Sequence, residues 1–423
     1  MQTLHISRWD IIGGAARATY GIHNALLQMG VDSRMQVQIK ASDEWRVSGP
    51  VSAQMRYAGQ LKCALGRIVT GLSTEPEGGP RKGSWFPSRL APGINASGTD
   101  IVHLHWIAEE TISLRELKRI DRPLLWTLHD MWPFCGTEHY APYDAGGRWR
   151  AGYTRANRSS AARGPDLDRH LYEIKRRAYD RQLSIVAPSA WIANCARESE
   201  LLADKPIEVI PHPQDLDRFK PLDRNHARAA LGLRQDATLI AFGAISGKED
   251  PRKGFDLLLE ALKRFKDSGQ AEHVQLVIFG QSAPRDPDLG VPFPVNFTGY
   301  LHDDVALALL YSACDLFVSP ARQEAFGLTS AEAACCGCPV VAFEGTGTAD
   351  LVDHRRTGYL ARPQCTADLA EGIKWALAAN RDGTLSRAAR SKAEAEWSYA
   401  TVGASYRSVY EAALDTYRGA RGG

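Results

Sequence analysis

Short runs of apolar residues alternate along the chain with stretches in which apolar residues recur every three or four positions. In the first half, the apolar runs occupy residues 3–8, 31–39, 101–106, 123–129, 184–189 and 207–212. Helical spacing follows the first run at residues 15–29, between the pair Gly13-Gly14 and Gly30, and another helix is expected from about Ala190. Apolar strands that alternate with helices predict a parallel sheet with crossover helices.

A second series of the same kind begins at residue 238. Its apolar runs lie at residues 238–243, 274–280, 295–300, 315–320 and 339–344, and helical spacing is found at 255–269, 303–313 and 326–336. Prolines at 211, 213 and 221 mark a linker. The pattern predicts an α/β protein with two Rossmann-like domains, 1–205 and 206–397. Residues 398–423 form an amphipathic tail that we expect to pack on the first domain.

Two stretches depart from this alternation. Residues 46–99 hold many Gly, Pro and Ser residues around the apolar segment 60–72, for which an interfacial helix and a buried helix are both open. Residues 141–170 carry six arginines and three aspartates with aromatic residues between them. This stretch is either a solvated loop or a surface for a phosphorylated lipid acceptor or an anionic membrane, with Arg148, Trp149 and Arg150 as the candidate contacts.

Charge and composition narrow the function classes. The chain has 51 Lys and Arg against 49 Asp and Glu, a net charge of +2, which argues against bulk binding of nucleic acid. No apolar run reaches the roughly 18 residues that cross a membrane, and the first residues do not resemble a secretion signal. The eight cysteines lack zinc-ligand spacing and are expected to be reduced. We therefore expect a cytoplasmic protein, with peripheral attachment to the cytoplasmic face of the inner membrane as an alternative.

Residues 319–347 carry the most specific chemistry. Glu324 precedes a Phe-Gly turn, and Glu332 falls in the second turn of the helix that follows. The first backbone N–H groups of that helix, at Phe326, Gly327 and Leu328, have no partner within it and suit a phosphate group. The two carboxylates can then bind hydroxyl groups on either side of the phosphate, as a sugar nucleotide requires. Taken alone, two glutamates on a helix face are more often simply solvated.

Together these residues resemble the retaining glycosyltransferases of family 4. The resemblance covers essentially the whole second half of the chain and rests on Glu324-x7-Glu332 with Phe326-Gly327, Gly337-x-Pro339-Val340-Val341, residues 315–320, and Arg252-Lys253-Gly254. It implies the GT-B fold, in which two Rossmann-like domains face each other across a cleft and the C-terminal helix returns to the first domain. It also implies that the first domain binds the acceptor and the second binds the nucleotide sugar.

The same resemblance implies a role for each matched residue of the second domain. Glu324 would contact hydroxyl groups of the donor sugar and Glu332 those of the ribose, while Tyr300 and Leu301 would lie near the base. Lys253 would neutralise the donor diphosphate, and a fixed cation there is chemically sensible because the departing diphosphate gains negative charge.

The chain departs from the family pattern at one position. The family places an arginine directly after the glycine that ends the preceding strand, and this chain has Ala244 after Gly243. Arg252 or Lys248 is the candidate for the missing cation, with Arg252 preferred.

In the first half, Gly13-Gly14 matches the glycine turn that the family brings close to the diphosphate. His129 stands at the end of an apolar strand, where α/β proteins place ligands. It matches a family histidine that faces the donor sugar and the acceptor. Asp130 either orients His129 or caps the loop that follows.

The resulting hypothesis is a retaining glycosyltransferase that moves a hexose-type sugar from a UDP- or GDP-linked donor to a saccharide or lipid-linked acceptor in cell-surface polysaccharide or exopolysaccharide biosynthesis. It needs neither a metal nor a cofactor beyond the donor. The alternatives are a sucrose-, trehalose- or glycogen-type synthase with a soluble acceptor, and a non-catalytic scaffold that binds nucleotide sugars. A dinucleotide dehydrogenase fits poorly because no GxGxxG follows the first strand.

Overall fold

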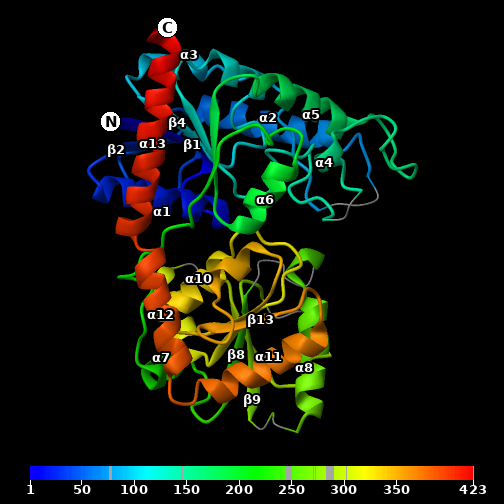
Figure 1. Cartoon of the computed structure of the whole chain (residues 1–423), viewed down its shortest axis with the longest axis vertical. Helices are drawn as coiled ribbons and strands as arrows, with labels where there is room; N and C mark the ends of the chain where they lie inside the picture. Colours follow the sequence, from blue (N-terminus) through cyan, green and yellow to red (C-terminus); the bar gives the residue numbers. More distant parts are fainter. Residues whose placement is uncertain are drawn as a thin grey trace. The chain divides into compact units, whose positions relative to one another are not determined.

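The computed structural model describes residues 1–75, 79–143, 146–243, 250–269, 271, 273–282, 290–301 and 303–422. The chain forms two compact units, one of Met1–Pro213 with Tyr399–Gly423 and one of Gln214–Ser398 (Figure 1). The boundary lies at Pro213 rather than at the predicted residue 205, because strand β7 (Ile207–Val209) pairs with β6 (Leu183–Ala187) of the first unit.

The described strands of the first unit form a seven-stranded parallel sheet in the order β3-β2-β1-β4-β5-β6-β7. Its other strands are β1 (Gln2–Trp9), β2 (Asp32–Ile39), β3 (Val47–Ser48), β4 (Ile101–Leu104) and β5 (Leu124–Thr127). Every residue of β4 and β5 is buried, as expected for central strands covered on both faces.

The helices of this unit include elements that the apolar pattern predicted and others that it did not. They are α1 (Gly14–Gln28), α2 (Ala53–Thr70), α3 (Ala91–Ala96), the 3₁₀ helix η1 (Leu114–Arg119), α4 (Arg148–Ala151), α5 (Leu167–Ala178), α6 (Ala190–Glu198) and α13 (Tyr399–Gly422). The segment 60–72 belongs to α2 and its end. In α2 only Cys63 and Gly66 are buried, so it is a surface helix.

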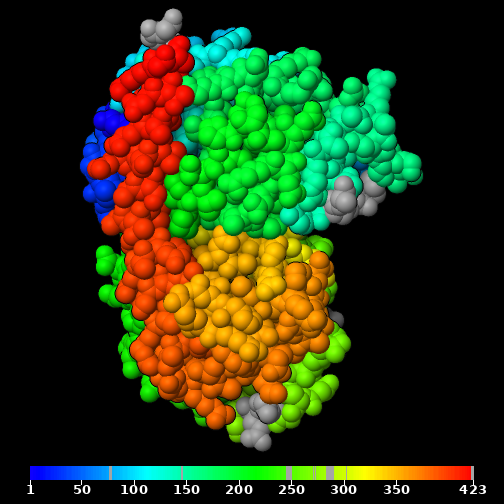
Figure 2. Space-filling model, viewed as in Figure 1, coloured from blue at the N-terminus to red at the C-terminus, as the bar shows by residue number. Residues whose placement is uncertain are grey.

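The C-terminal tail packs on the first unit, as predicted. Helix α13 lies against α1 and is visible in red on the surface in Figure 2. Two of its tyrosines reach the sheet: the Tyr410 hydroxyl lies 2.7 Å from His103 Nδ1, and the Tyr406 hydroxyl lies 3.1 Å from Thr127 Oγ1.

The described strands of the second unit form a six-stranded parallel sheet in the order β10-β9-β8-β11-β12-β13. They are β8 (Thr238–Gly243), β9 (Val274–Phe279), β10 (Val295–Gly299), β11 (Leu316–Ser319), β12 (Val340–Phe343) and β13 (Gly358–Ala361). The helices are α7 (Arg224–Ala230), η2 (Pro251–Lys253), α8 (Phe255–Asp267), α9 (Asp304–Ala313), α10 (Leu328–Cys335), η3 (Gly347–Leu351), α11 (Thr366–Ala379) and α12 (Thr384–Glu396).

This sheet has a core on each face. Leu239 and Ala241 of β8 belong to one apolar cluster, whereas Ile240 and Phe242 belong to the other. Successive side chains of a strand point to opposite faces, so a strand between two helical layers must be apolar throughout. Because all the strands run the same way, their carboxyl ends meet at one edge, and the loops that leave this edge are brought together.

The described part of the chain contains no helix that is both long and apolar enough to cross a membrane. All eight cysteines are free.

Candidate active site

The loops at the carboxyl edge of the second sheet bring together most of the residues that the sequence singled out. Lys253 follows β8, Tyr300 and Leu301 follow β10, and Glu324 and Gly327 follow β11. Open parallel sheets bind ligands at this edge.

Lys253 and Glu324 form an ion pair, with 2.6 Å between Nζ and Oε2. Burial alone would raise the pKa of Glu324, but the charges of Lys253 and Arg252 and the hydrogen bond from Lys253 hold this pKa below its usual value. Both side chains remain partly accessible to solvent. The edge therefore presents a positioned cation beside a carboxylate that stays ionised at neutral pH.

Arg322 holds together the two segments that carry the Lys253–Glu324 pair. Its guanidinium makes two contacts of 2.8 and 2.6 Å with Asp256 of α8, and its backbone N–H donates to the carbonyl oxygen of Arg252 over 2.7 Å. These contacts join the loop after β11 to the start of α8. Sequence reasoning missed Arg322 because its partner lies 66 positions away and no local pattern links the two.

The two loops also approach each other closely at Gly254. This residue has φ 69°, and a Cβ placed on it would lie 1.9 Å from the carbonyl oxygen of Pro320. Only glycine fits here, which explains the glycine after Lys253 in the motif.

Helix α10 begins at Leu328, two residues later than predicted, and Gly327 with φ 94° is its N-cap. Phe326 packs in the core before the helix. The hydroxyl groups of Ser330 and Thr348 lie near Gly327: a Cβ placed there would be 3.6 Å from Ser330 Oγ and 2.7 Å from Thr348 Oγ1.

Neither of these buried hydroxyls has a hydrogen-bond partner among the described residues. Two unpaired O–H donors beside the first N–H groups of a helix fit the oxygens of a phosphate. Sequence reasoning identified the helix start and overlooked both hydroxyls, although their presence in the GLTS and GTGT segments was the available clue.

The residues expected near the nucleoside are placed as follows. Glu332 lies in the second turn of α10, is 4% exposed and accepts a hydrogen bond of 2.9 Å from the Tyr311 hydroxyl of α9. Tyr300 is 47% exposed, and Leu301 packs against the core. Their contacts with ribose and base stay predictions.

Arg252, the preferred candidate for the second cation, pairs with Asp250 at 2.6 Å. Its charge nevertheless contributes to the lowered pKa of Glu324, so it acts on the site electrostatically. Ala244 and Lys248 lie outside the described residues.

In the first unit, the carboxyl edge carries the glycine turn and His129, from which a row of histidines runs into the sheet. Gly13 has φ 88° and precedes α1, which begins at Gly14. The buried Asp10 fixes this loop, because its carboxylate accepts hydrogen bonds from the backbone N–H groups of Ile11, Ala41 and Ser42. Burial would raise the pKa of Asp10, but hydrogen bonds from Ser42 and its neighbours bring it below the usual value.

His129 follows β5 and is held by other histidines. Its Nε2 lies 3.0 Å from His105 Nδ1, and His105 Nε2 lies 2.8 Å from His5 Nδ1. The ring of His212 stacks on it at 5.1 Å. Burial lowers the pKa of His129 to about 4 despite the nearby charge of Asp130. His129 is therefore neutral at physiological pH, with Nδ1 as the ring nitrogen outside this chain of contacts.

Asp130 caps the loop after β5, which was one of the two roles left open. Its carboxylate accepts hydrogen bonds from the Trp132 backbone N–H at 2.9 Å and from the Trp106 indole at 2.9 Å, and it lies 2.6 Å from His139 Nδ1.

Among the described residues, two clusters of the first unit have side-chain spacing that suits a metal ion. One is made of histidines, His5-His103-His105, and the other of carboxylates, Glu75-Asp166-Asp168. Hydrogen bonds connect the histidines to one another and to Tyr410 and Thr127. The carboxylates form ion pairs with Arg158, Arg148 and Arg81. These contacts connect both clusters to neighbouring residues of the unit, and the expectation that no metal is needed stays a prediction.

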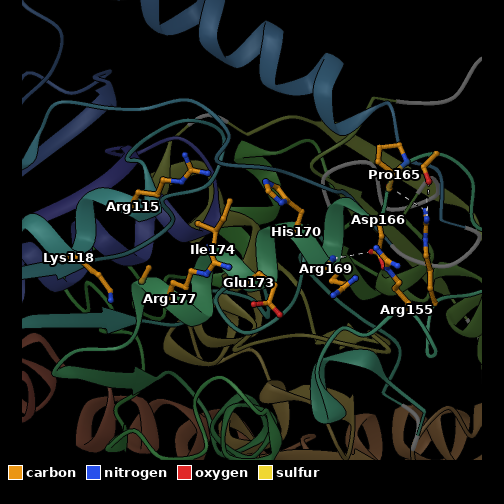
Figure 3. Close-up of a pocket in the computed structure, with 13 residues that line it drawn as sticks. Arg115, Lys118, Arg155, Pro165, Asp166, Arg169, His170, Glu173, Ile174 and Arg177 are labelled. Carbon is orange, nitrogen blue, oxygen red and sulfur yellow. Dashed lines mark hydrogen bonds between the residues drawn. The ribbon is translucent and has the colours of Figure 1, made fainter.

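Among the described residues of the stretch 141–170, some side chains face the surface and others are covered by the rest of the unit. Arg155, Arg158 and Arg169 line a groove at the surface of the first unit (Figure 3).

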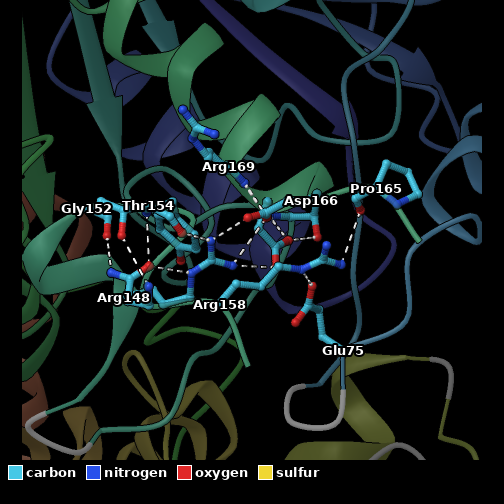
Figure 4. A network of polar contacts seen from close by, with 12 residues as sticks. Glu75, Arg148, Gly152, Thr154, Arg158, Pro165, Asp166 and Arg169 are labelled. Atoms are coloured by element: carbon cyan, nitrogen blue, oxygen red, sulfur yellow. Dashed lines mark hydrogen bonds and ion pairs between the residues drawn. The ribbon is translucent and has the colours of Figure 1, made fainter. Parts of the chain in front are cut away.

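Of the three residues proposed as acceptor or membrane contacts, Trp149 is buried, and Arg148 and Arg150 are half-buried. Trp149 is buried in the core, Arg148 pairs with Asp166 at 2.7 Å (Figure 4), and Arg150 pairs with Glu198 at 2.9 Å. The burial of Trp149 contradicts its assignment as a surface contact. Arg148 and Arg150 are paired within the unit, and their contacts with an acceptor or a membrane stay predictions.

Comparison with known proteins decides the family. Residues 12–218 match the model described as Glycosyltransferase Family 4, and residues 236–379 match the one described as Glycosyl transferases group 1. The chain belongs to the family 4 glycosyltransferases. This glycosyltransferase is 34% identical over 242 residues to a D-inositol 3-phosphate glycosyltransferase of Geodermatophilus obscurus, and 33% identical over 269 residues to one of Nocardia farcinica. These alignments cover 53% and 59% of the chain and 52% and 58% of the relatives, so the chain spans little more than half the length of the curated relatives it matches.

Solved structures of glycosyltransferases resemble the whole chain. Sucrose-phosphate synthase from Thermosynechococcus elongatus has a TM-score of 0.68 at 19% identity and covers 98% of this chain and 100% of its own. Anabaena HepE in complex with UDP and glucose has a TM-score of 0.63 at 17% identity, with 97% and 99% covered. At these identities the likeness shows the fold, which is that of the GT-B glycosyltransferases.

Proposed function

We propose that this glycosyltransferase moves a hexose-type sugar, with retention of its anomeric configuration, from a UDP- or GDP-linked donor to a saccharide or lipid-linked acceptor in cell-surface polysaccharide biosynthesis. One observation carries the proposal. The Lys253–Glu324 pair occupies the carboxyl edge of the second sheet, where α10 also begins and Ser330 and Thr348 leave two buried hydroxyls without a partner.

Each part of this edge matches one part of a nucleotide sugar. The N-terminus of α10 with the two hydroxyls suits the diphosphate, and Lys253 supplies a compensating cation. Glu324 accepts hydrogen bonds from sugar hydroxyls, and its low pKa keeps it an acceptor. Anabaena HepE, which shares the fold, holds UDP and glucose, which supports such a donor here.

The reaction proceeds on one face of the sugar. The acceptor oxygen forms a bond to the anomeric carbon while the bond from that carbon to the leaving phosphate oxygen breaks. The acceptor proton passes to an oxygen of the departing diphosphate. The chain contributes electrostatic stabilisation of the leaving group by Lys253 and fixed positioning of the sugar by Glu324.

We place the acceptor on the first unit, near His129. A neutral imidazole there can hydrogen-bond a sugar hydroxyl without competing for the proton that the phosphate takes up. A structural neighbour, WaaG, is a glycosyltransferase of lipopolysaccharide biosynthesis, which supports a cell-surface acceptor (TM-score 0.60).

A soluble phosphorylated acceptor is the second candidate, because the relatives from Geodermatophilus and Nocardia are named for D-inositol 3-phosphate. A product formed from a soluble phosphorylated polyol or sugar would favour it over a lipid-linked acceptor. A scaffold that only binds the donor would show no turnover with any acceptor.

The test measures release of nucleoside diphosphate from UDP- and GDP-sugars with lipid-linked, saccharide and phosphorylated polyol acceptors. Lys253→Ala is expected to lower kcat about 100-fold or more, the usual cost of removing a group that stabilises transition-state charge. The matched control is Lys263→Ala, at an exposed position of the neighbouring helix, and we expect it to be unchanged.

Two further measurements test the retention of anomeric configuration and the independence from metal ions. NMR of the product gives its anomeric configuration, and turnover in a metal chelator is expected to be unchanged. Equal activity of the Lys253→Ala and Lys263→Ala variants would contradict the proposed site.

A further inference from the structure

A basic groove lies on the outer side of α5, between that helix, η1 and residues 155–165 (Figure 3). Its volume is about 970 Å³, and it is lined by six cationic side chains, those of Arg115, Lys118, Arg155, Arg158, Arg169 and Arg177. Among the described residues, Asp166 and Glu173 are the only acidic ones that line it. This excess of positive charge is local, because basic and acidic residues nearly balance over the whole chain.

The two acidic residues form ion pairs with arginines that do not line the groove. Asp166 pairs with Arg148 at 2.7 Å and also caps α5 by accepting the Arg169 backbone N–H (Figure 4). Glu173 pairs with Arg176 at 2.9 Å. They therefore neutralise little of the positive charge that faces the groove.

Four of the arginines remain available to a ligand. Within the part of the chain that the structure describes, the guanidinium groups of Arg115, Arg155, Arg169 and Arg177 make neither a hydrogen bond nor an ion pair. Cations gathered in a concave surface attract anions, and the planar guanidinium pairs with two oxygens of a phosphate at once.

The groove is separate from the glycine turn and His129. Helix η1 ends at Arg119, just before β5 begins at Leu124, and α5 ends at Ala178, just before β6 begins at Leu183. Arg115, Lys118 and Arg177 thus lie toward the amino ends of the strands, opposite to the carboxyl edge that carries Gly13 and His129.

An apolar stripe on α2 supplies a second, independent observation. Leu61, Leu65 and Ile68 follow one another at intervals of four and three residues, so they share one face of α2, and Leu72 lies two residues beyond the end of the helix. These four side chains are between 40% and 64% exposed. The buried Cys63 and Gly66 face the unit instead, so the apolar stripe points into solvent, the reverse of the usual arrangement.

The stripe adjoins the groove at the end of α2. The carbonyl oxygen of Leu72 lies so close to Gly164, a groove residue, that a Cβ there would be 2.0 Å from it. Trp85 makes a second link: its indole N–H donates to Thr70 Oγ1 of α2 over 2.9 Å, and its ring stacks on His170 of the groove.

We propose that the basic groove is a binding site for phosphate groups of an anionic ligand, distinct from the donor site. The neighbouring stripe favours an amphiphile, whose phosphate headgroup occupies the groove and whose apolar part lies against α2. An exposed apolar helix face beside clustered arginines is the arrangement that binds anionic lipid surfaces.

The experiment compares two ligands and three variants in the full chain. Inorganic pyrophosphate is titrated calorimetrically into protein that carries Lys253→Ala, so that the proposed donor site does not contribute. Cosedimentation is measured with vesicles of phosphatidylglycerol and phosphatidylcholine, and with vesicles of phosphatidylcholine alone.

The groove variant combines Arg115→Gln, Arg169→Gln and Arg177→Gln. Its charge-matched control combines Lys263→Gln, Arg381→Gln and Arg418→Gln, at exposed positions away from the groove. The stripe variant combines Leu61→Ser and Ile68→Ser.

We expect phosphatidylglycerol vesicles to bind the wild type, and the groove variant to bind them about 100-fold more weakly while the charge-matched control does not. The stripe variant should lose vesicle binding and keep pyrophosphate binding. Binding of pyrophosphate alone, again lost in the groove variant, would support the phosphate site with a soluble ligand as its source. Equal loss in the groove variant and its control, or no binding of either ligand, would overturn the proposal.

Discussion

At the carboxyl edge of the second sheet, Lys253 affects the ionisation of Glu324, and Glu324 affects the position of Lys253. The lysine keeps the carboxylate ionised, and the carboxylate holds the ammonium group in one place. A nucleotide sugar would present its diphosphate to Lys253 and its hydroxyl groups to Glu324. Positioned charge of this kind lowers a barrier because it needs no rearrangement as the leaving group departs.

Arg322 is expected to act through this pair rather than on the substrate. Removing it by Arg322→Ala frees the loop that carries Glu324, so we predict that kcat/KM for the donor falls about threefold to tenfold, the range typical of coupled contacts. Asp256→Asn, which removes the ion pair from the other side, should have a similar effect.

The double variant tests whether the two residues act together. If they do, Arg322→Ala combined with Asp256→Asn costs little more than either change alone. Fully additive losses would show that Arg322 acts by some other route.

At the scale of elements, the start of α10 is the most constrained point of the site. Gly327 takes a left-handed φ of 94° and lies against Thr348, and the helix presents its first N–H groups and Ser330 just beyond it. A side chain at this position would strain the backbone and displace Thr348.

We therefore predict that Gly327→Ala destabilises the protein by about 1–3 kcal/mol and weakens nucleotide binding. The matched control is Gly232→Ala, at a position with φ 65° and no atom within 4 Å of the added Cβ. It should cost about 1 kcal/mol from the backbone alone and leave binding intact. Urea denaturation and calorimetry measure the two effects; equal binding by both variants would contradict the assignment of this helix start.

The sequence predicted most strands because parallel strands buried on both faces are apolar throughout, as β4, β5 and β8 show. It did not identify α5, whose many charged residues resemble those of a loop, or the orientation of α2, whose apolar face points to solvent. Which side of a helix meets the core depends on packing that no local pattern contains.

The residues of the candidate site divide in the same way, into those that a local motif identifies and those that only the fold brings together. Lys253, Glu324 and Gly327 stand in local motifs and were found. Arg322 was missed because its contact with Asp256 links two strand–helix units, and Thr348 because it joins α10 only through the fold. The wrong assignment of Trp149 has a related cause, since an aromatic residue among arginines looks the same in sequence whether it is exposed or buried.

At the scale of the whole molecule, buried histidines of the first unit link its stability to pH. The first contains six histidines whose pKa values burial lowers, namely His5, His23, His103, His105, His129 and His212. Unfolded histidines bind protons near pH 6.5. Burial lowers the pKa of His23 and of His129 to about 4 and also lowers the pKa values of the other four. The unfolded state then binds more protons, and stability falls as pH falls through this interval.

We predict that the first unit loses up to about 1.4 kcal/mol per pH unit for each such histidine between about pH 6.5 and 4. Glu138, whose pKa burial raises to about 7, and Glu110, whose pKa burial also raises, oppose this change. Urea midpoints at pH 7.5, 6.5 and 5.5 measure the slope, and His5→Gln should make it shallower. A midpoint that does not change over this range would contradict neutral burial of these rings.

The roles proposed for Lys253, Glu324 and the start of α10 all require that the carboxyl edge of the second unit holds a nucleoside diphosphate. Calorimetric titration with UDP, GDP, ADP and dTDP tests it most directly, in the wild type and in the Lys253→Ala and Ser330→Ala variants. We predict that the wild type binds one of the four selectively. We further predict that Lys253→Ala weakens binding about tenfold or more and that Ser330→Ala weakens it severalfold, as expected for a charged and a neutral hydrogen bond. Failure of the folded wild type to bind any of them, or unchanged affinity in both variants, would contradict the account.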